Sequence, residues 1–261
     1  QPLAMSRGIR DFIRETYGVR SIDVKLRKVG SVFNSTYFAS FKIDDREEKI
    51  FVKKYLNWTD FKWVAAWLWA IGVKNFSVLA SSRMSNEIYF INKLSELGFN
   101  TAEILHINWP KKMIFQRFID GVDGLKALKN ASEPRIFDDI SYRVGKILAM
   151  VHEKGICIGD CNPFTFIFVG DEAYLVDLEQ CSFEGSKPWD LCELLFYTGR
   201  YLNLEEVERF SKNVVQGYLE IGERDVVKDA LDQRFIRIFV PWTPPWIQSR
   251  IKRSVVEILG S

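Results

Sequence analysis

The sequence has little of what several protein classes require. Among its 261 residues are only two histidines and four cysteines, and 36 basic side chains nearly balance 34 acidic ones, which leaves a formal net charge of +2. Such a balance gives no general case for a nucleic-acid or anionic-membrane partner. The 47% hydrophobic and 27% charged fractions are those of an ordinary globular protein.

Long hydrophobic runs are also missing. The longest, WVAAWLWAIGV, extends from Trp63 to Val73 and falls well short of the roughly 20 residues that span a bilayer. Two interpretations of this run stay open. It is either a helix buried against its own domain or a surface helix that docks on a partner protein or a membrane interface.

The few cysteines are confined to one third of the chain, at Cys157, Cys161, Cys181 and Cys192. We expect them to be buried, reduced thiols of a cytoplasmic protein. A zinc site that uses Cys157 and Cys161 is the minor alternative, because only His106 and His152 exist to complete it.

Hydrophobic patterning predicts a β-rich first part of the chain. Strand patterns occur in SIDVKLRKVG, SVFNSTYFASFKI, EKIFVKKYL, AEILHIN and KKMIFQRFI, and helical spacing occurs at 6–17, 58–82 and 83–98. This pattern therefore predicts that residues 1–118 form a five-stranded antiparallel sheet with a helix packed on it. The Trp-rich stretch forms a helical insertion at 57–82 of this lobe.

The second part, 119–261, is mainly helical with one embedded hairpin, FIFV and AYLVDL. Helices are expected at 134–152, 188–199, 204–220, 224–238 and 246–259. The whole chain thus predicts an α+β fold of two lobes, with a cleft between them where ligands often bind.

Two aspartates flank the embedded hairpin. Asp160 lies in the polar turn GDCNP before FIFV, and Asp177 ends the next hydrophobic run. Aspartates are common in turns, so either one alone indicates little. Other polar residues of interest precede them in the chain, at Gly30, Lys53, Lys54 and Glu87.

Together these residues suit phosphoryl transfer. A polar loop approaches the phosphates, a lysine neutralises them, and a glutamate orients that lysine. One aspartate accepts or positions the proton of an acceptor hydroxyl, and the other holds the metal that bridges the phosphates.

The segment VHEKGICIGDCNPFTFIFVGDEAYLVDLEQ is similar to the pattern LHxxGxxHGDxxxxN…DFG/E of protein-kinase-like enzymes. Over nearly its whole length the sequence resembles that superfamily. It looks most like the small atypical members, namely RIO kinases, the kinase subunit of the KEOPS tRNA-modification complex and lipopolysaccharide-core kinases. The resemblance implies a bilobal kinase fold, serine/threonine-protein-kinase-like activity, ATP, and Mg²⁺ or Mn²⁺.

The resemblance also implies roles for single residues. Asp160 matches the catalytic aspartate and Asp177 the metal-binding one. His152 matches a structural histidine at a helix end, and Asp190 in KPWDLCELL matches the aspartate that braces the catalytic loop. The loop that contacts nucleotide and the backbone that binds adenine correspond to Gly30, Ser31, Asn34, Ser35, Gln116 and Phe118.

Several positions depart from the family pattern. Thr165 stands where the family has a metal-binding asparagine, and Asn162 is the alternative ligand. Ile158 replaces the family's histidine, and DFG reads DLE. A hydroxyl is a weaker metal ligand than an amide carbonyl. We therefore expect the threonine at this position to weaken metal binding.

The lysine and its partner also have alternatives. Lys53 and Lys54 are adjacent on the third strand and point to opposite faces of the sheet. We favour Lys53, with Lys54 kept as the other candidate for phosphate contact. Glu87 is the expected partner of the lysine, and Glu96 is the alternative partner. The non-functional interpretation of Glu87 is a solvated helix carboxylate.

The segment between Asp177 and Asp190 is short and has no APE motif, so it lacks room for the platform that binds an extended peptide. Three functions stay open. The first is an ATP-dependent phosphotransferase of the atypical serine/threonine kinase class, including autophosphorylation or ATP hydrolysis. The second is a small-molecule or glycan kinase, and the third is a pseudokinase scaffold that binds nucleotide weakly.

Overall fold

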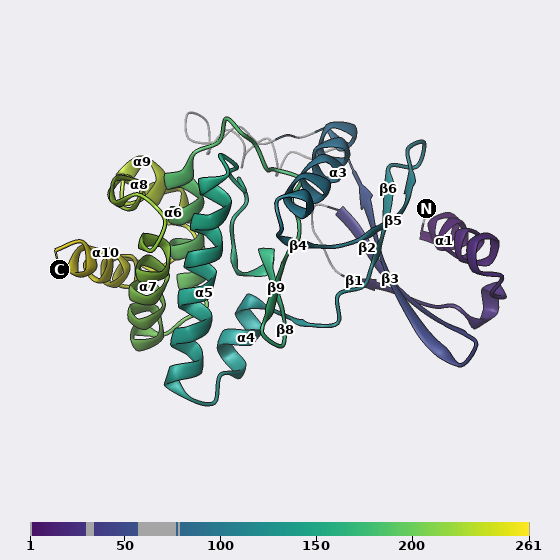
Figure 1. Cartoon of the computed structure of the whole chain (residues 1–261), viewed down its shortest axis with the longest axis horizontal. Helices are drawn as coiled ribbons and strands as arrows, with labels where there is room; N and C mark the ends of the chain where they lie inside the picture. The colour runs from purple at the N-terminus through teal and green to yellow at the C-terminus, as the bar shows by residue number, and fades with distance from the viewer. Residues whose placement is uncertain (1, 30–33, 57–76, 78, 261) are drawn as a thin grey trace.

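The computed structural model describes residues 2–29, 34–56, 77 and 79–260 (Figure 1). Two sequence predictions therefore lie outside the described residues. One is the Trp-rich helical insertion, except for its last residues, which form the start of a helix at Ala80. The other is the nucleotide contact of Gly30 and Ser31.

The larger of two sheets contains five strands in the order β1-β2-β3-β6-β5, with every neighbouring pair antiparallel. The strands are β1 (Lys25–Val29), β2 (Asn34–Ile43), β3 (Arg46–Tyr55), β5 (Ile104–Asn108) and β6 (Met113–Arg117). The sheet that the sequence predicts is confirmed. Its first strand is shorter than expected, because residues 21–23 form a 3₁₀ turn.

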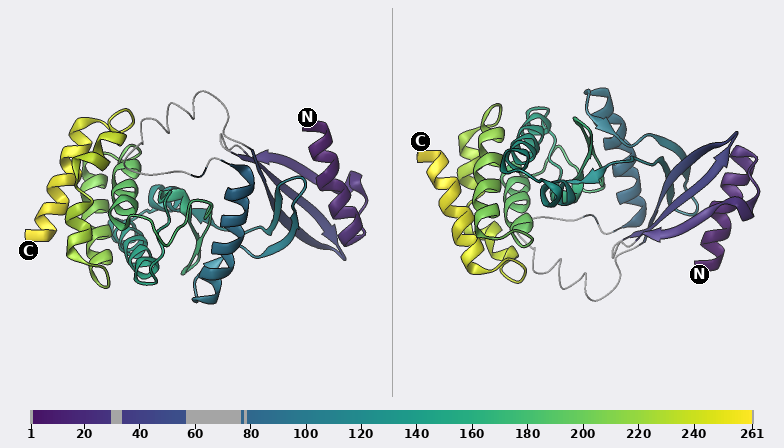
Figure 2. Two further views of the ribbon diagram at one scale, coloured as in Figure 1. Left: turned by 90° about the horizontal axis from the view of Figure 1, so that it is seen from above. Right: turned by 90° about the horizontal axis from the view of Figure 1, so that it is seen from below.

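Helices cover both faces of this sheet (Figures 1 and 2). Helix α1 (Pro2–Tyr17) buries Ile9 and Ile13 against one face, in a cluster that includes Val52 of β3. Helix α3 (Ala80–Glu96) packs Met84 against the other face, beside Tyr55 of β3. Since side chains alternate along a strand, every second residue of β3 faces α3.

A smaller sheet extends the predicted hairpin, in the order β4-β9-β8-β7. Its strands are β4 (Asn100–Thr101), β7 (Val122–Asp123), β8 (Phe166–Val169) and β9 (Glu172–Leu175). The hairpin β8–β9 was expected, but the two outer strands were not. Each has only two residues, which is too short for an alternating pattern to be recognised in the sequence.

The second lobe is built from helices around one large hydrophobic core (Figure 1, left side). They are α4 (Gly124–Asn130), α5 (Pro134–Glu153), α6 (Lys187–Gly199), α7 (Leu204–Leu219), α8 (Arg224–Asp229), α9 (Gln233–Ile236) and α10 (Pro245–Gly260). Helix α6 runs through this core, with Leu191, Leu194 and Leu195 fully buried. The site loops before it are therefore anchored on a rigid element.

The single helix predicted at 224–238 is wrong. The chain forms α8, then α9, then a 3₁₀ turn at Arg237–Phe239. The break occurs at Asp232, whose carboxylate accepts a hydrogen bond from Arg234 N at 2.7 Å and so begins a new helix. The hydrophobic spacing continues across the break, which is why the pattern alone predicts one helix.

We propose that the lobes divide between residues 118 and 119, because β6 completes the larger sheet just before this point. One short strand lies ahead of the boundary and yet belongs to the other sheet, since β4 pairs with β9 in parallel. Within the described part of the chain, no helix is long and hydrophobic enough to cross a membrane.

Candidate functional site

Lys53 of β3 lies at the centre of a group of carboxylates between the lobes. It faces α3, and its Nζ donates to Glu87 Oε2 at 2.7 Å and to Asp177 Oδ1 at 2.5 Å. It also pairs with Glu179 Oε2 at 3.0 Å. Lys54 points to the opposite face of the strand. Strand alternation therefore decides which lysine enters the acidic group.

The charge on Lys53 is strongly stabilised. Burial alone works against the ammonium group, but the carboxylates of Asp177 and Glu179, with that of Glu87, outweigh it and raise the pKa of Lys53 well above its ordinary value. Lys53 is 5% exposed, so little water competes with these partners. The side chain is a fixed positive charge at the centre of these carboxylates.

Glu87 is held by two donors, since its Oε2 accepts from Lys53 Nζ and from the hydroxyl of Tyr55. Burial, and then the charge of Glu87, raise the pKa of Tyr55 well above its ordinary value. Burial also raises the pKa of Glu87, against the opposing charge of Lys53. The alternative partner, Glu96, lies at the end of α3, is 69% exposed and pairs with Lys93 at 3.6 Å.

Asp177 follows β9 in a left-handed conformation, with φ 60°. Such a conformation is uncommon outside glycine and often occurs at functional sites. Its side chain is 54% exposed, unlike those of its acidic neighbours. The backbone thus turns this carboxylate outward from the core while Lys53 holds one of its oxygens.

Glu179 is the residue that the sequence reasoning missed. It is 5% exposed and accepts from Arg83 Nη1 at 2.9 Å and from Asn34 Nδ2 at 2.9 Å, besides Lys53. Burial opposes its charge, but Lys53 and Arg83 lower its pKa. The one local signal was the DLE motif, where an acid replaces glycine, because its partner Arg83 lies on α3, far earlier in the sequence.

Asp160 lies in the loop between α5 and β8, partly buried beside the acidic group. Its Oδ1 accepts from Asn162 Nδ2 at 2.9 Å. Burial, followed by the negative charge of Asp177, raises the pKa of Asp160 to about 6. The carboxyl is therefore mostly ionised at pH 7 and close enough to neutrality to exchange a proton.

The structure places Asn162 and Thr165 in hydrogen bonds within this loop. The hydroxyl of Thr165 donates to Asp160 O at 3.1 Å and accepts from Asn162 N at 3.2 Å. Asn162 Oδ1 accepts from Phe164 N at 3.0 Å. The pair forms a reciprocal cap on the turn Pro163–Thr165. Their predicted role as metal ligands stays a prediction.

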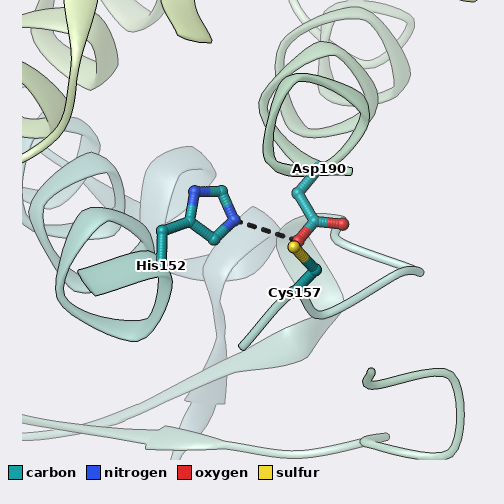
Figure 3. A group of neighbouring side chains, drawn as sticks. All are labelled: His152, Cys157 and Asp190. Carbon is teal, nitrogen blue, oxygen red and sulfur yellow. Dashed lines mark hydrogen bonds and ion pairs between the residues drawn. The ribbon is translucent and has the colours of Figure 1, made fainter. Parts of the chain in front are cut away.

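The start of the same loop is braced from α6, and Figure 3 shows Asp190 of this helix beside His152 and Cys157. Asp190 accepts from Ile158 N at 2.6 Å, from Gly159 N at 2.7 Å and contacts His152 Nε2 at 3.0 Å. The other ring nitrogen of His152 meets Tyr218 Oη at 2.7 Å. The ligand atoms of His152, Cys157 and Asp190 lie within 4.8 Å of one another. Backbone amides occupy both oxygens of Asp190 and Tyr218 occupies one ring nitrogen of His152, so these two side chains are arranged to brace the loop.

The residues predicted to contact the nucleotide lie on β2, on β6 and just after β6. Asn34 joins the Glu179 group and is 4% exposed, and Ser35 pairs with Lys54 across β2 and β3. Gln116 pairs with Phe51 in the sheet and is 5% exposed. The amide of Phe118 donates to Lys49 O at 3.2 Å, so this amide is already used within the protein.

The acidic group fits a divalent cation by its donor chemistry. Oxygen atoms of Glu87, Asp177 and Glu179 lie within 4.8 Å of one another, and carboxylates are the ligands that Mg²⁺ prefers. Lys53 and Arg83 together balance the charges of the two buried carboxylates, Glu87 and Glu179. The exposed carboxylate, Asp177, is therefore the one suited to hold the ion.

Comparisons with known proteins relate the chain to kinases, although no family model matches it. It is 29% identical over 94 residues to a probable serine/threonine-protein kinase Bud32 homologue from Archaeoglobus fulgidus, which covers 35% of this chain and 48% of that protein. It is 26% identical over 152 residues to the KEOPS complex subunit Bud32 of Pyrococcus abyssi, covering 56% of this chain and 67% of that protein. The match thus spans about half the length of the first relative and two thirds of the second.

A solved structure shares the fold. An ethanolamine kinase from Plasmodium vivax aligns with a TM-score of 0.53 and 12% sequence identity, over 99% of this chain and 83% of that chain. The predicted α+β bilobal kinase-like fold is confirmed. The expected relationship to atypical kinases is confirmed as well, because both relatives are Bud32 proteins and the first is named as a probable serine/threonine-protein kinase.

Proposed function

We propose that this chain, which has the protein-kinase-like fold and is related to the Bud32 kinases, is an ATP-dependent phosphotransferase of the atypical serine/threonine kinase class. It transfers the γ-phosphate of ATP to an acceptor hydroxyl. The observation that carries the proposal is the meeting of Lys53, Glu87 and Asp177 from three separate elements within hydrogen-bond distance.

In this proposal Lys53 binds the phosphates. Its Nζ presents a positive charge at the centre of the carboxylates, and Glu87 with Tyr55 holds the side chain in place. A charge fixed before the reaction costs no reorganisation when negative charge develops on the transferred group. Asn34 and Ser35, with Gly30 and Ser31, are proposed to border the nucleotide, and the backbone near Gln116 and Phe118 to meet adenine.

Asp160 is proposed to take the proton of the acceptor hydroxyl. It is ionised at neutral pH and is oriented by Asn162. A carboxylate with a pKa close to the working pH is suited to accept a proton from a bound hydroxyl. Asp190 and His152 hold the loop that carries it.

Asp177 is proposed to hold Mg²⁺ or Mn²⁺, with Asn162 and Thr165 as the further candidate ligands. When bound, such an ion would neutralise the charge of the phosphates. The partly exposed position of Asp177 supports this role, since the ion keeps several of its waters.

The acceptor is proposed to be a protein serine or threonine, and a small molecule or glycan is the second candidate. The short segment between β9 and α6 favours the second, because its first part is held by hydrogen bonds to the rest of the protein. Asn86 Nδ2 donates to Glu179 O at 2.9 Å and to Cys181 O at 2.8 Å, and Cys157 and Ser182 pair through their backbones. A segment held in this way offers little room for an extended peptide. A cytoplasmic location and a protein partner, as in the KEOPS subunit named above, belong to the same proposal.

The test is ADP formation and label transfer from γ-labelled ATP with Mg²⁺ or Mn²⁺. We expect the wild type to release ADP, and the variants Asp160→Asn and Asp177→Asn to lose at least about a hundredfold in rate. The matched control is Asp171→Asn, in the exposed turn of the same hairpin, which should keep the full rate. Equal rates in all four proteins would refute the proposal.

The same experiment separates the remaining readings. Label on the protein itself supports a protein acceptor, whereas ADP release that rises with added sugars or amino alcohols supports a small-molecule acceptor. Stabilisation by ATP without metal and without turnover identifies a nucleotide-binding scaffold.

A further inference from the structure

Helix α6 runs along the loop that carries Asp160 and contacts it at successive points. Asp190 accepts from Ile158 N at 2.6 Å. Glu193, about one turn later on the same face of the helix, accepts from Cys161 N at 2.9 Å. The contacts advance together along the helix and along the loop, so the end of α6 lies beside the part of the loop that follows Asp160.

Three aromatic rings meet at this end of the helix. Phe164, four residues after Asp160, is 42% exposed and lies edge-on to Tyr201, with the ring centroids 6.1 Å apart. The ring centroids of Tyr197 and Tyr201 are 5.9 Å apart, and their hydroxyl oxygens are 3.4 Å apart. Phe164 N also donates to the side chain of Asn162, which in turn donates to Asp160. The rings are therefore connected to the proposed reacting carboxylate through the same turn.

An arginine completes this group, which we call the aromatic–arginine cluster and which consists of Phe164, Tyr197, Arg200 and Tyr201. Arg200 Cζ lies 5.3 Å from the ring centroid of Tyr197 and 5.0 Å from that of Tyr201. At such distances the ring faces attract a guanidinium. The side chain is exposed, and its guanidinium makes no hydrogen bond or ion pair within the described residues. Two rings thus hold the arginine while its N–H groups stay available.

A simpler role for Arg200 is the stabilisation of the helix end. Arg200 directly follows Gly199, the last residue of α6, and a positive charge there opposes the helix dipole. This role needs the charge, but it needs neither the planar shape of the guanidinium nor two rings beside it. A planar guanidinium stacked on aromatic rings instead suits paired hydrogen bonds to a phosphate or a carboxylate.

We propose that the aromatic–arginine cluster is the acceptor site, and that its ligand is a small hydroxyl compound that carries a phosphate or carboxylate group. The inference rests on the proposed phosphotransferase function and selects the second acceptor class named there. Arg200 binds the anionic group, and the rings cover the adjoining carbon skeleton. The reaction is the transfer proposed above, in which the acceptor oxygen bonds to the γ-phosphorus of ATP, ADP leaves, and the hydroxyl proton goes to Asp160.

A binding measurement without turnover tests the site directly. The charged probes are glycerol 3-phosphate, ribose 5-phosphate and glycerate, and glycerol and ribose are their uncharged matches. Each is titrated into protein saturated with Mg²⁺ and a non-hydrolysable ATP analogue. The ¹⁵Nε resonance of Arg200, assigned by its loss in Arg200→Gln, should move with at least one charged probe and stay in place with both uncharged ones. If no charged probe moves it, the site is refuted.

Two substitutions separate anion binding from a simple charge at the helix end. Arg200→Lys keeps the positive charge but loses the planar pair of donors, and Arg200→Gln loses both. In ADP release stimulated by a charged probe, we expect KM for that probe to rise about threefold or more in Arg200→Lys and about tenfold or more in Arg200→Gln. The matched control is Arg135→Gln, an exposed arginine in the first turn of α5, which should keep the wild-type KM.

The outcomes keep this inference separate from the proposed activity. If the Arg200 resonance moves but no ADP is released, the proposed function fails and the cluster stands as an anion site. If KM for the charged probe is the same in the wild type, Arg200→Lys and Arg200→Gln, the site is refuted. Charged probes that move the resonance without changing ADP release would show that the cluster is not the acceptor site. Label transfer to a protein serine or threonine that no charged probe reduces would also overturn the inference.

Discussion

At the residue scale, the described site depends on charges that are buried together. Glu179 accepts from Lys53, Arg83 and Asn34, which come from three different elements of the first lobe. Arg83 is fully buried. Removing one partner of a buried ion pair costs more than the pair contributes, since the other charge stays behind without compensation.

We therefore expect Glu179→Gln to lower the free energy of unfolding by about 3 kcal/mol or more, measured by urea denaturation. Glu184→Gln makes the same chemical change in the exposed part of the same segment and should stay within about 0.5 kcal/mol of the wild type. Equal stability of the two variants would show that Glu179 is not an essential partner of the buried cations.

Glu193 gives the stability of the protein a pH dependence. Its pKa is raised in the folded state, so the folded protein retains a proton that the unfolded chain releases above about pH 4.3. The resulting stabilisation is complete below that pH and is lost as the pH rises toward the folded-state pKa.

Glu193→Gln carries no such proton. Its free energy of unfolding should therefore rise relative to the wild type by up to about 1.4 kcal/mol per pH unit as the pH increases above about 4.3. Denaturation curves of both proteins across this range measure the difference. Parallel pH profiles would show that Glu193 ionises normally in the folded protein.

At the element scale, the second lobe depends on a close crossing of α5 and α7. A Cβ on Gly145 would lie 1.9 Å from Val214 O, and one on Gly217 would lie 2.0 Å from Tyr142 O. Both contacts are with backbone, which moves less easily than a side chain. The two glycines therefore set the distance between the helix that leads into the Asp160 loop and the helix packed behind it.

Gly145→Ala should destabilise the protein by about 3 kcal/mol, because the helices have to move apart to admit one methyl group. Gly260→Ala at the end of α10 is the control, since nothing lies within 4 Å of the added atom. Thermal and urea unfolding measure both variants. A Gly145→Ala protein as stable as the control would contradict the close packing of α5 and α7.

At the scale of the whole molecule, the sequence predicts the order of the lobes, the five-stranded sheet and most of the candidate charged residues of the site. It does not predict which of these charged side chains contact one another. The pattern of β3 identifies opposite faces for Lys53 and Lys54, but only the packing of α3 shows which face holds the acids. Glu179 was missed because its partners, Arg83 and Asn34, are far away in sequence. Such long-range contacts have no local periodicity.

The most direct test of the account is the chemical labelling of the lysine that lies beside the phosphates of bound ATP. An acyl-phosphate derivative of ATP transfers its acyl group to an amine near the phosphates, and it needs no knowledge of the acceptor. After labelling with Mg²⁺, proteolysis and mass spectrometry, we expect acylation of Lys53 that excess ATP suppresses and that leaves Lys54 unlabelled. Labelling of Lys54 instead of Lys53, or labelling that ATP does not suppress, would contradict the account.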